Sequence, residues 1–292
     1  MRSENLYGIV LMLLAMAALS MMDATMKQLA GHYPPLEVAT LRGLVSLPFV
    51  IGWIGWRERG FGTLLRIRWR WHLARGVLAV LMLGSFIYAL GQMPLSATYS
   101  LFFIAPLLIT ALSVPLLKET VDWQRWTAIA VGFGGVLVIL RPGFGDAVGW
   151  SALAALIGAT CYALNAITVR ILGRTDSTAA MTFWFMVMLI IGAGALALPD
   201  WQAVRSADAG WLLAMGITGA MGQVFITEAF KRAPVSVIAP FEYSSLFWGV
   251  LLDLAIWGEL PGTVVFAGAA IIVGSGLYLI HRERRPTVVA PP

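Results

Sequence analysis

The sequence predicts an all-α integral membrane protein with ten transmembrane helices, arranged as two inverted five-helix repeats. Of its 292 residues, 59% are hydrophobic and 12% are charged, whereas soluble domains are about 45–50% apolar and about 25% charged. The apolar residues form runs long enough to cross a bilayer as helices, which takes about 20 residues. The second half of the chain also repeats features of the first half. These three observations support the predicted fold class.

The apolar runs divide into ten predicted spans. The region 76–117 contains no charged residue and is interrupted by Gly91–Pro94, so it is interpreted as two helices joined by a turn. The apolar run at 6–22 is longer than the core of a typical signal peptide, so we expect a retained helix there. The ten predicted spans are 6–28, 36–56, 72–91, 95–117, 123–140, 147–170, 178–198, 209–230, 235–257 and 260–280.

The basic residues predict how the chain is oriented in the membrane. With the N-terminus inside, most of the 20 Lys and Arg residues fall in inside segments, Arg75 among them. Only Lys27, Arg141 and Arg205 fall outside, and Arg42 lies within a span. Cytoplasmic loops carry such an excess of basic residues. The net charge of +5 therefore reports topology and not nucleic-acid binding. We expect a bacterial-type inner (plasma) membrane location with both termini in the cytoplasm.

The chain contains an internal repeat. A shift of 140 residues pairs Pro94 with Pro234, and a shift of 142 residues pairs Asp23 with Asn165. Each half then holds five spans, and because five is odd, the second half enters the membrane from the opposite side. Inverted repeats are common in secondary transporters, although gene duplication in a membrane enzyme or scaffold is the alternative. The predicted units are a first repeat at 1–143, a second repeat at 144–285 and a disordered cytoplasmic tail at 286–292.

Three stretches carry a resemblance to a known family. They are "YALGQMPLSATYSLFFIAPLL" from Tyr88, its echo "EAFKRAPVSVIAPFEYSSLFWGVLLDLAIWGE" from Glu228, and "LRGL" at Leu41–Leu44. In their order and repetition these stretches resemble the drug/metabolite transporter superfamily, specifically its EamA-type ten-helix members. The resemblance implies export of amino acids and related metabolites, or in some members import of vitamins, choline-like compounds or S-adenosylmethionine. It also implies a central cavity lined by spans three, four, six and nine, together with spans one and eight.

Charged residues inside the spans are the first candidates for contact with a solute. Asp23 and Arg42 both fall in the outer third of the predicted membrane core. Arg42 could attract a substrate carboxylate while Asp23 binds an amine, or the two could form a structural ion pair. Lys27 shares a helix face with Asp23, and we expect it to extend to the outer interface.

Two carboxylates nearer the inner side are candidates for proton coupling. Glu242 lies about 10 Å into its predicted helix, counted from Val235, and has no basic neighbour in sequence. Glu228 is three residues from Lys231 and could simply pair with it. Asp253 is expected at the outer interface. An isolated carboxylate inside a membrane is usually functional, so Glu242 is the stronger of the two candidates.

Aromatic and amide side chains complete the predicted substrate site. An aromatic wall with a few polar groups suits an amino acid side chain or a flat metabolite, although each aromatic alone is more often a packing residue. Glycines in spans five and ten are assigned to close helix packing, and Pro106, Pro115 and Pro240 to helix kinks. The aromatic residues of the spans that should line the cavity are Tyr88, Tyr99, Tyr162, Tyr243, Phe102, Phe103 and Trp248, and Asn165 is added as the repeat counterpart of Asp23.

An enzyme is the main rival class, and the residues do not favour it. Gly143–Asp146 has the Gly-x-Gly-Asp form of intramembrane aspartyl proteases, but that chemistry needs a second aspartate at the same depth. The sequence carries no zinc-protease His-Glu-x-x-His motif and no P-loop. Cys161 is the single cysteine, so no internal disulfide can form. We predict no catalytic residues, no metal and no cofactor.

The sequence therefore predicts a secondary carrier that most closely fits an exporter of amino acids or amino-acid-derived metabolites by alternating access. The alternative is an importer of a cofactor-like solute such as riboflavin or S-adenosylmethionine, and an intramembrane enzyme is a distant third. The predicted partners are the small-molecule solute and the lipid bilayer. The residues do not set the oligomeric state, and a homodimer is left open.

Overall fold

The computed structural model describes residues 2–58, 64, 67–117, 123–139, 146–172, 175–232 and 239–283. All regular elements within these ranges are helical. The α-helices are α1 (Arg2–Ala30), α2 (Pro35–Glu58), α3 (Trp69–Gln92), α4 (Leu95–Phe102), α5 (Ala105–Leu117), α6 (Trp123–Ile139), α7 (Asp146–Leu172), α8 (Thr178–Ala197), α9 (Ala209–Arg232), α11 (Ser244–Leu252) and α12 (Thr263–Glu283). The short helices are the 3₁₀ turns η2 (Leu198–Asp200), η3 (Ser206–Asp208) and η4 (Ala239–Tyr243) and the π-helical turn η5 (Asp253–Trp257).

Seven helices in the described ranges are long and apolar enough to cross a membrane. Two shorter apolar helices lie at Trp126–Val138 and Thr263–Tyr278, where the sequence predicts spans five and ten. Such a set of helices makes the chain a multi-pass membrane protein. The seven long spans are Leu6–Ala30, Pro35–Trp56, Trp69–Gln92, Leu95–Leu116, Gly149–Val169, Ala179–Asp200 and Ser206–Ile226.

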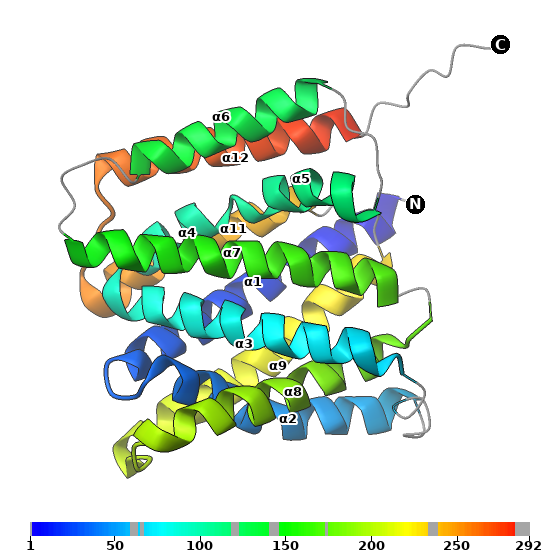
Figure 1. Ribbon diagram of the computed structural model, residues 1–292, viewed down its shortest axis with the longest axis vertical. Helices are drawn as coiled ribbons and strands as arrows, with labels where there is room; N and C mark the ends of the chain where they lie inside the picture. Colours follow the sequence, from blue (N-terminus) through cyan, green and yellow to red (C-terminus); the bar gives the residue numbers. More distant parts are fainter. Residues whose placement is uncertain are drawn as a thin grey trace.

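The helices pack in pairs that join distant parts of the chain. α1 packs along α9, α3 along α7, α2 along α8 and α6 along α12, while α4 packs against α11. Figure 1 shows α6 and α12 together at one edge of the bundle and α2 and α8 at the opposite edge. Each of these pairs joins one helix from the predicted first repeat to one from the predicted second repeat.

Two predicted spans are interrupted helices. Within 95–117, α4 ends at Phe102 and α5 begins at Ala105. Pro106 explains the break, because proline has no N–H to donate and its ring clashes with the carbonyl of residue i−4, here Phe102. The described part of the ninth span consists of η4, α11 and η5 in succession, and Pro240 lies in its first turn. Broken helices inside a membrane need partners for the freed backbone groups.

The connections at the two ends of the bundle are tied by polar contacts. On the predicted outer side, the Tyr33 hydroxyl donates to Asp208 Oδ2 at 2.7 Å. On the predicted inner side, His72 Nε2 lies 2.9 Å from Asp176 Oδ2, and the Arg68 backbone N–H donates to the same oxygen at 3.2 Å. In each contact, a residue in a connection of one predicted repeat pairs with a residue at or just before the start of a helix of the other repeat.

Some sequence predictions fall outside the described residues. They include the tail at 286–292, the side chains of Glu228 and Asp146, and the Gly-x-Gly segment before Asp146.

Candidate transport site

A chain of aromatic contacts runs through the middle of the helix bundle. The Phe86 ring of α3 stacks with Tyr99 of α4 at 6.4 Å between centroids and meets Phe102 edge-on at 5.0 Å. Phe102 in turn lies 5.4 Å from Tyr162 of α7. Through Phe103, which follows α4, the chain continues from Tyr99 at 6.3 Å to Tyr243 of η4 at 5.0 Å. We call this set (Phe86, Tyr99, Phe102, Phe103, Tyr162 and Tyr243) the aromatic chain.

The Asp23 carboxylate contacts Tyr99, which lies within the aromatic chain between Phe86 and Phe103. The Tyr99 hydroxyl donates a 2.6 Å hydrogen bond to Asp23 Oδ2, and both residues are buried. A bond of this length to a charged acceptor is among the stronger hydrogen bonds in proteins. Ser20, one helical turn before Asp23, is buried, and its hydroxyl lies close to that of Tyr99. The Asp23 carboxylate is thus held in place by Tyr99, a member of the aromatic chain.

Arg42 faces the same region but does not form the expected ion pair. Its charge interacts electrostatically with that of Asp23, yet among the described residues no salt bridge within 4.0 Å joins the two. The Arg42 Nε and Nη1 atoms are buried and have no hydrogen-bond partner. A buried guanidinium with unused N–H donors can bind an anionic group. The geometry is therefore compatible with the ligand role predicted for Arg42.

Glu242 lies near both tyrosines that end the aromatic chain. It interacts electrostatically with Tyr162 and Tyr243. Among the described residues, its carboxylate makes neither a hydrogen bond nor an ion pair. The Ser245 hydroxyl donates to the backbone carbonyl of Glu242 and not to its carboxylate. The Tyr243 hydroxyl is buried and also lacks a partner. This carboxylate is therefore free to exchange a proton or meet a cation, as its predicted coupling role requires.

Arg75 is a candidate that the sequence interpretation missed. We counted it only as a basic residue of the inside segments, and the structure shows that Arg75 is buried within α3 at 6% exposure. Its Nε donates to Asn165 Oδ1 at 3.1 Å. Asn165 was selected from the repeat alone, and its contact with an arginine gives that choice a physical basis. A charged residue near the end of an apolar run gives no sequence signal that separates a loop from a buried position.

Two further expectations near the outer side were wrong. We expected Lys27 to extend to the interface, but its amine donates to Asp253 Oδ1 at 3.1 Å and lies 4.0 Å from the Trp257 ring centroid. Asp253, expected at the interface, is fully buried and also accepts the backbone N–H groups of Leu95 and Ser96 at 2.9 and 2.8 Å. These two N–H groups have no intrahelical acceptor at the start of α4, and Asp253 supplies one.

The structure does not bring every predicted residue to the aromatic chain. Tyr88 is 41% exposed and makes none of the ring contacts found in the described residues. Trp248 lies in a separate cluster with Met12 of α1 and Phe241. The side chain of Glu228 is outside the described residues. Tyr88 and Trp248 are thus poorer candidates for solute contact than Tyr99, Tyr243 and Asn165.

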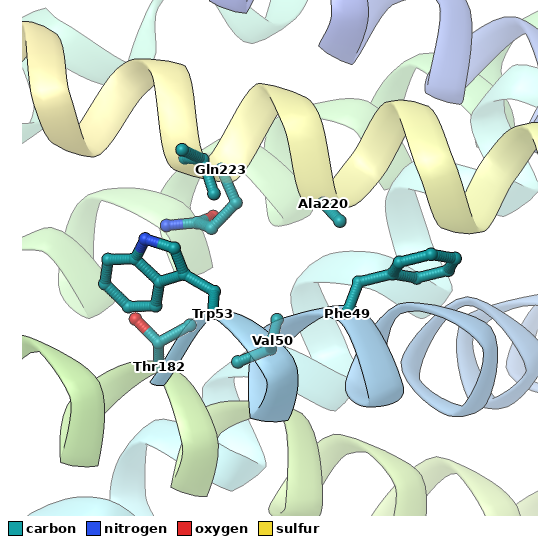
Figure 2. Close-up of a pocket in the computed structure, with 7 residues that line it drawn as sticks. Phe49, Val50, Trp53, Thr182, Ala220 and Gln223 are labelled. Carbon is teal, nitrogen blue, oxygen red and sulfur yellow. The ribbon is translucent and has the colours of Figure 1, made fainter. Parts of the chain in front are cut away.

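Two hollows lie away from the aromatic chain. Figure 2 shows the first, between α2, α8 and α9, with Trp53 placed between Gln223 and Thr182. Its volume is about 20 Å³, enough for about one water molecule. An open, mostly apolar groove of about 500 Å³ lies between α6 and α12. In the described ranges no group of three or more His, Cys, Asp or Glu side chains could hold a metal ion.

Comparison with known proteins identifies relatives along most of the chain. The chain is 30% identical over 244 residues to a riboflavin transporter of Rhizobium johnstonii, covering 83% of this chain and 78% of that protein. It is 28% identical to an S-adenosylmethionine uptake transporter of Rickettsia prowazekii, covering 96% and 94%. It is 26% identical to the pseudopaline exporter CntI of Pseudomonas aeruginosa, covering 95% and 97%. These relatives are named as transporters.

A solved structure and a family model also match this chain. A solved crystal structure superposes with a TM-score of 0.67 at 19% identity, covering 98% of this chain and 99% of that one, which supports the fold alone. The model of the EamA-like transporter family matches residues 6–141 and 149–281. The resemblance predicted from the sequence is therefore confirmed, and the chain is a membrane transporter that belongs to the EamA-like transporter family.

Proposed function

We propose that this protein is a secondary carrier for a small metabolite derived from an amino acid. The aromatic chain carries the proposal, because its ring contacts from Tyr99 through Phe103 to Tyr243 connect the region of Asp23 and Arg42 to Glu242. A flat ring can stack along such a wall. An amine and a carboxylate could then be bound by Asp23 and by the unused donors of Arg42. S-adenosylmethionine has all three of these parts.

The proposed mechanism is alternating access between two inverted five-helix repeats. Support comes from the family model, which matches residues 6–141 and 149–281 separately. Further support comes from helix pairing: exchanging the two halves maps the α1–α9 pair onto the α7–α3 pair, while α2–α8 and α6–α12 map onto themselves. Such symmetry lets the two halves exchange conformations around a site near the membrane midplane.

Riboflavin is the second candidate solute. The relatives named as riboflavin transporters favour it, and its flat ring system would suit the aromatic chain. Riboflavin has neither a carboxylate nor an amine, so it would leave the charges of Asp23 and Arg42 without a role in binding. We also propose a bacterial-type inner-membrane location with cytoplasmic termini, on the excess of basic residues in the predicted inside loops. Export remains a prediction, since the relatives include uptake transporters and an exporter.

Counterflow into proteoliposomes tests the proposal. Vesicles containing the purified protein are loaded with unlabelled S-adenosylmethionine, L-methionine or riboflavin and then given the labelled compound outside. We expect saturable uptake of S-adenosylmethionine that exceeds uptake by protein-free vesicles and is lost in Arg42→Ala. Flux of riboflavin without flux of any amino-acid-derived compound would replace the proposal with the second candidate. No saturable flux of either class would overturn both.

A further inference from the structure

Arg75 is held inside the bundle by neutral groups. It lies on α3 and meets α7 and α8, where its Nε donates to Asn165 Oδ1 at 3.1 Å and its Nη1 donates to the Met181 carbonyl at 3.3 Å. The face of the Phe185 ring lies 5.5 Å from the guanidinium carbon. None of these three partners carries a negative charge.

The charge of Arg75 is therefore uncompensated within the described part of the chain. No carboxylate there lies within 4.0 Å of its guanidinium. A cation inside the membrane costs about 2.5–3.5 kcal/mol by insertion scales, so such residues usually pair or line a solute path. An arginine has five N–H donors, and acceptors are found for two of them here. The remaining donors are available to an anion.

Asn165 adds a second unused donor beside Arg75. Its Oδ1 accepts from Arg75, while its Nδ2 is buried and has no hydrogen-bond partner. Arg75 has no acceptor, and Oδ1, the side-chain acceptor of Asn165, already accepts from Arg75. The polar groups that this pair offers to a ligand are therefore N–H donors. Carboxylates offer about four lone pairs and match the planar fork of arginine. The chemistry of the pair fits a carboxylate better than a neutral or cationic group.

The pair formed by Arg75 and Asn165 differs in charge from the pair of Arg42 and Asp23 on the predicted outer side. Asp23, the repeat counterpart of Asn165, supplies a carboxylate that interacts with the charge of Arg42. At the inner position the amide of Asn165 cannot neutralise Arg75. Asn165 also lies one turn after Tyr162 on the same face of α7, so the site adjoins the aromatic chain. Arg75 is about 9 Å from the start of α3 at Trp69, on the predicted inner side.

We propose that Arg75 and Asn165 form a second binding site for the carboxylate group of the transported solute, on the predicted inner side, which the solute occupies at a different stage of transport from the Arg42 site. The identity of the solute depends on the proposed function above, whereas carboxylate binding does not. The competing explanation is that Arg75 only ties α3 to α7 and α8. A lipid phosphate at the inner membrane surface is a further candidate anion for the same donors.

The experiment measures thermal unfolding of the full chain in maltoside micelles without phospholipid. The probes are L-methionine, acetate, inorganic phosphate, and 3-methylthiopropylamine, which is methionine without its carboxylate, all at one ionic strength. Binding to the native state alone raises the unfolding temperature. We expect L-methionine and acetate to raise it saturably and the amine to leave it unchanged. Wild-type protein that does not respond to carboxylates, or responds to phosphate alone, would overturn the proposal.

Three variants locate the response. Arg75→Gln should raise the half-saturating carboxylate concentration at least tenfold, whereas Arg70→Gln, an exposed arginine on the same helix, should leave it unchanged. If Arg75→Gln does not fold, Asn165→Asp still decides, because it places a carboxylate beside Arg75. This variant should unfold at a higher temperature without probe and should no longer respond to acetate. An acetate response equal to that of the wild type would mean that the pair is structural.

Counterflow separates this inference from the proposed function. A carboxylate response that depends on Arg75 and Asn165, without flux of any tested solute, would retain the site and remove the proposed function. Flux of S-adenosylmethionine whose concentration dependence is unchanged in Asn165→Asp would retain the function and remove the site.

Discussion

Lys27 Nζ lies 3.1 Å from Asp253 Oδ1 and thereby joins the end of α1 to a π-helical turn 226 residues later. The same carboxylate accepts two backbone N–H groups and the Ser96 hydroxyl at the start of α4. One buried aspartate thus links three separate segments on the predicted outer side. Because α1 and α4 belong to the first predicted repeat and η5 to the second, this contact holds the two halves together at that side.

Loss of this contact should destabilise the protein. We expect Asp253→Asn to lower the free energy of unfolding by about 3 kcal/mol or more, since it breaks a buried ion pair and leaves Lys27 with the exposed Glu259 as its remaining carboxylate partner. Glu259→Gln, which removes the exposed partner of Lys27, should cost about 0.5 kcal/mol or less. A double-mutant cycle of Lys27→Gln and Asp253→Asn, followed by thermal unfolding in micelles, should give a coupling of about 0.5–3 kcal/mol. Strict additivity of the two changes would contradict the assigned contact.

The bond from Tyr99 to Asp23 should matter for both stability and transport. Tyr99→Phe removes the donor and leaves a buried carboxylate oxygen unsatisfied, at a cost of about 1–3 kcal/mol. If Asp23 binds the solute, the half-saturating concentration in counterflow should also change. Tyr88→Phe is the matched control, because Tyr88 is 41% exposed and lies outside the aromatic chain. Equal effects of the two substitutions would argue against a role of Asp23 in the site.

The tie at Asp176 should give the protein an acid-sensitive contact on the predicted inner side. Burial raises the pKa of Asp176, but hydrogen bonds from Thr175, His72 and the Arg68 backbone N–H outweigh it, so the pKa lies below its ordinary 3.8. A lowered native pKa stabilises the fold above the unfolded value, and this contribution is lost as pH falls through the native value.

Asp176→Asn should accordingly lower the unfolding temperature at pH 7. The difference from the wild type should shrink below pH 3.8, where the wild-type carboxyl takes up a proton. Unfolding followed by tryptophan fluorescence across the acid range measures both effects. A difference that stays constant down to the most acid pH would show that the charge of Asp176 contributes nothing.

Glu242 should couple transport to protons. We expect Glu242→Gln to abolish accumulation driven by a pH gradient while leaving counterflow intact, since counterflow needs no net proton movement. Glu259→Gln is the control, because Glu259 is exposed and lies outside the aromatic chain. Retained gradient-driven accumulation in Glu242→Gln would exclude this residue as the coupling group.

Close packing of α9 on α2 depends on a glycine. A Cβ added at Gly216 would lie 2.9 Å from the Val45 carbonyl oxygen, so the two helices would have to separate. Gly216→Ala should therefore cost about 1–3 kcal/mol. Gly210→Ala on the same helix meets nothing within 4 Å, and it should be neutral or slightly stabilising. Thermal unfolding of the two variants compares them directly, and a neutral Gly216→Ala would contradict this packing.

The sequence predicted those features that depend on local composition. The long apolar runs marked the seven long spans, since hydropathy alone decides which segments enter a bilayer. Pro106 marked the break between α4 and α5 because its effect is confined to its own turn. Tyr99, selected from its place after a turn, and Asn165, selected from the repeat, both make polar contacts, and their role in substrate binding stays a prediction.

What the sequence could not provide was pairing between distant side chains. Nothing near Lys27 indicates that Asp253 would be its partner, and the capping of α4 by that residue has no local signature. Arg75 was not singled out because a cation near the end of an apolar run fits a loop as well as a helix interior. Only the packing of α3 against α7 and α8 separates the two.

The cross-pairing of helices has a consequence for biosynthesis. α1, α2, α3 and α6 each find their main neighbour among helices that leave the ribosome later. The early helices can therefore be inserted in the membrane yet remain unassembled until α7, α8, α9 and α12 arrive. A fragment that stops after α6 should be a loose set of inserted helices prone to degradation. Supplying the remainder as a separate polypeptide should rescue it.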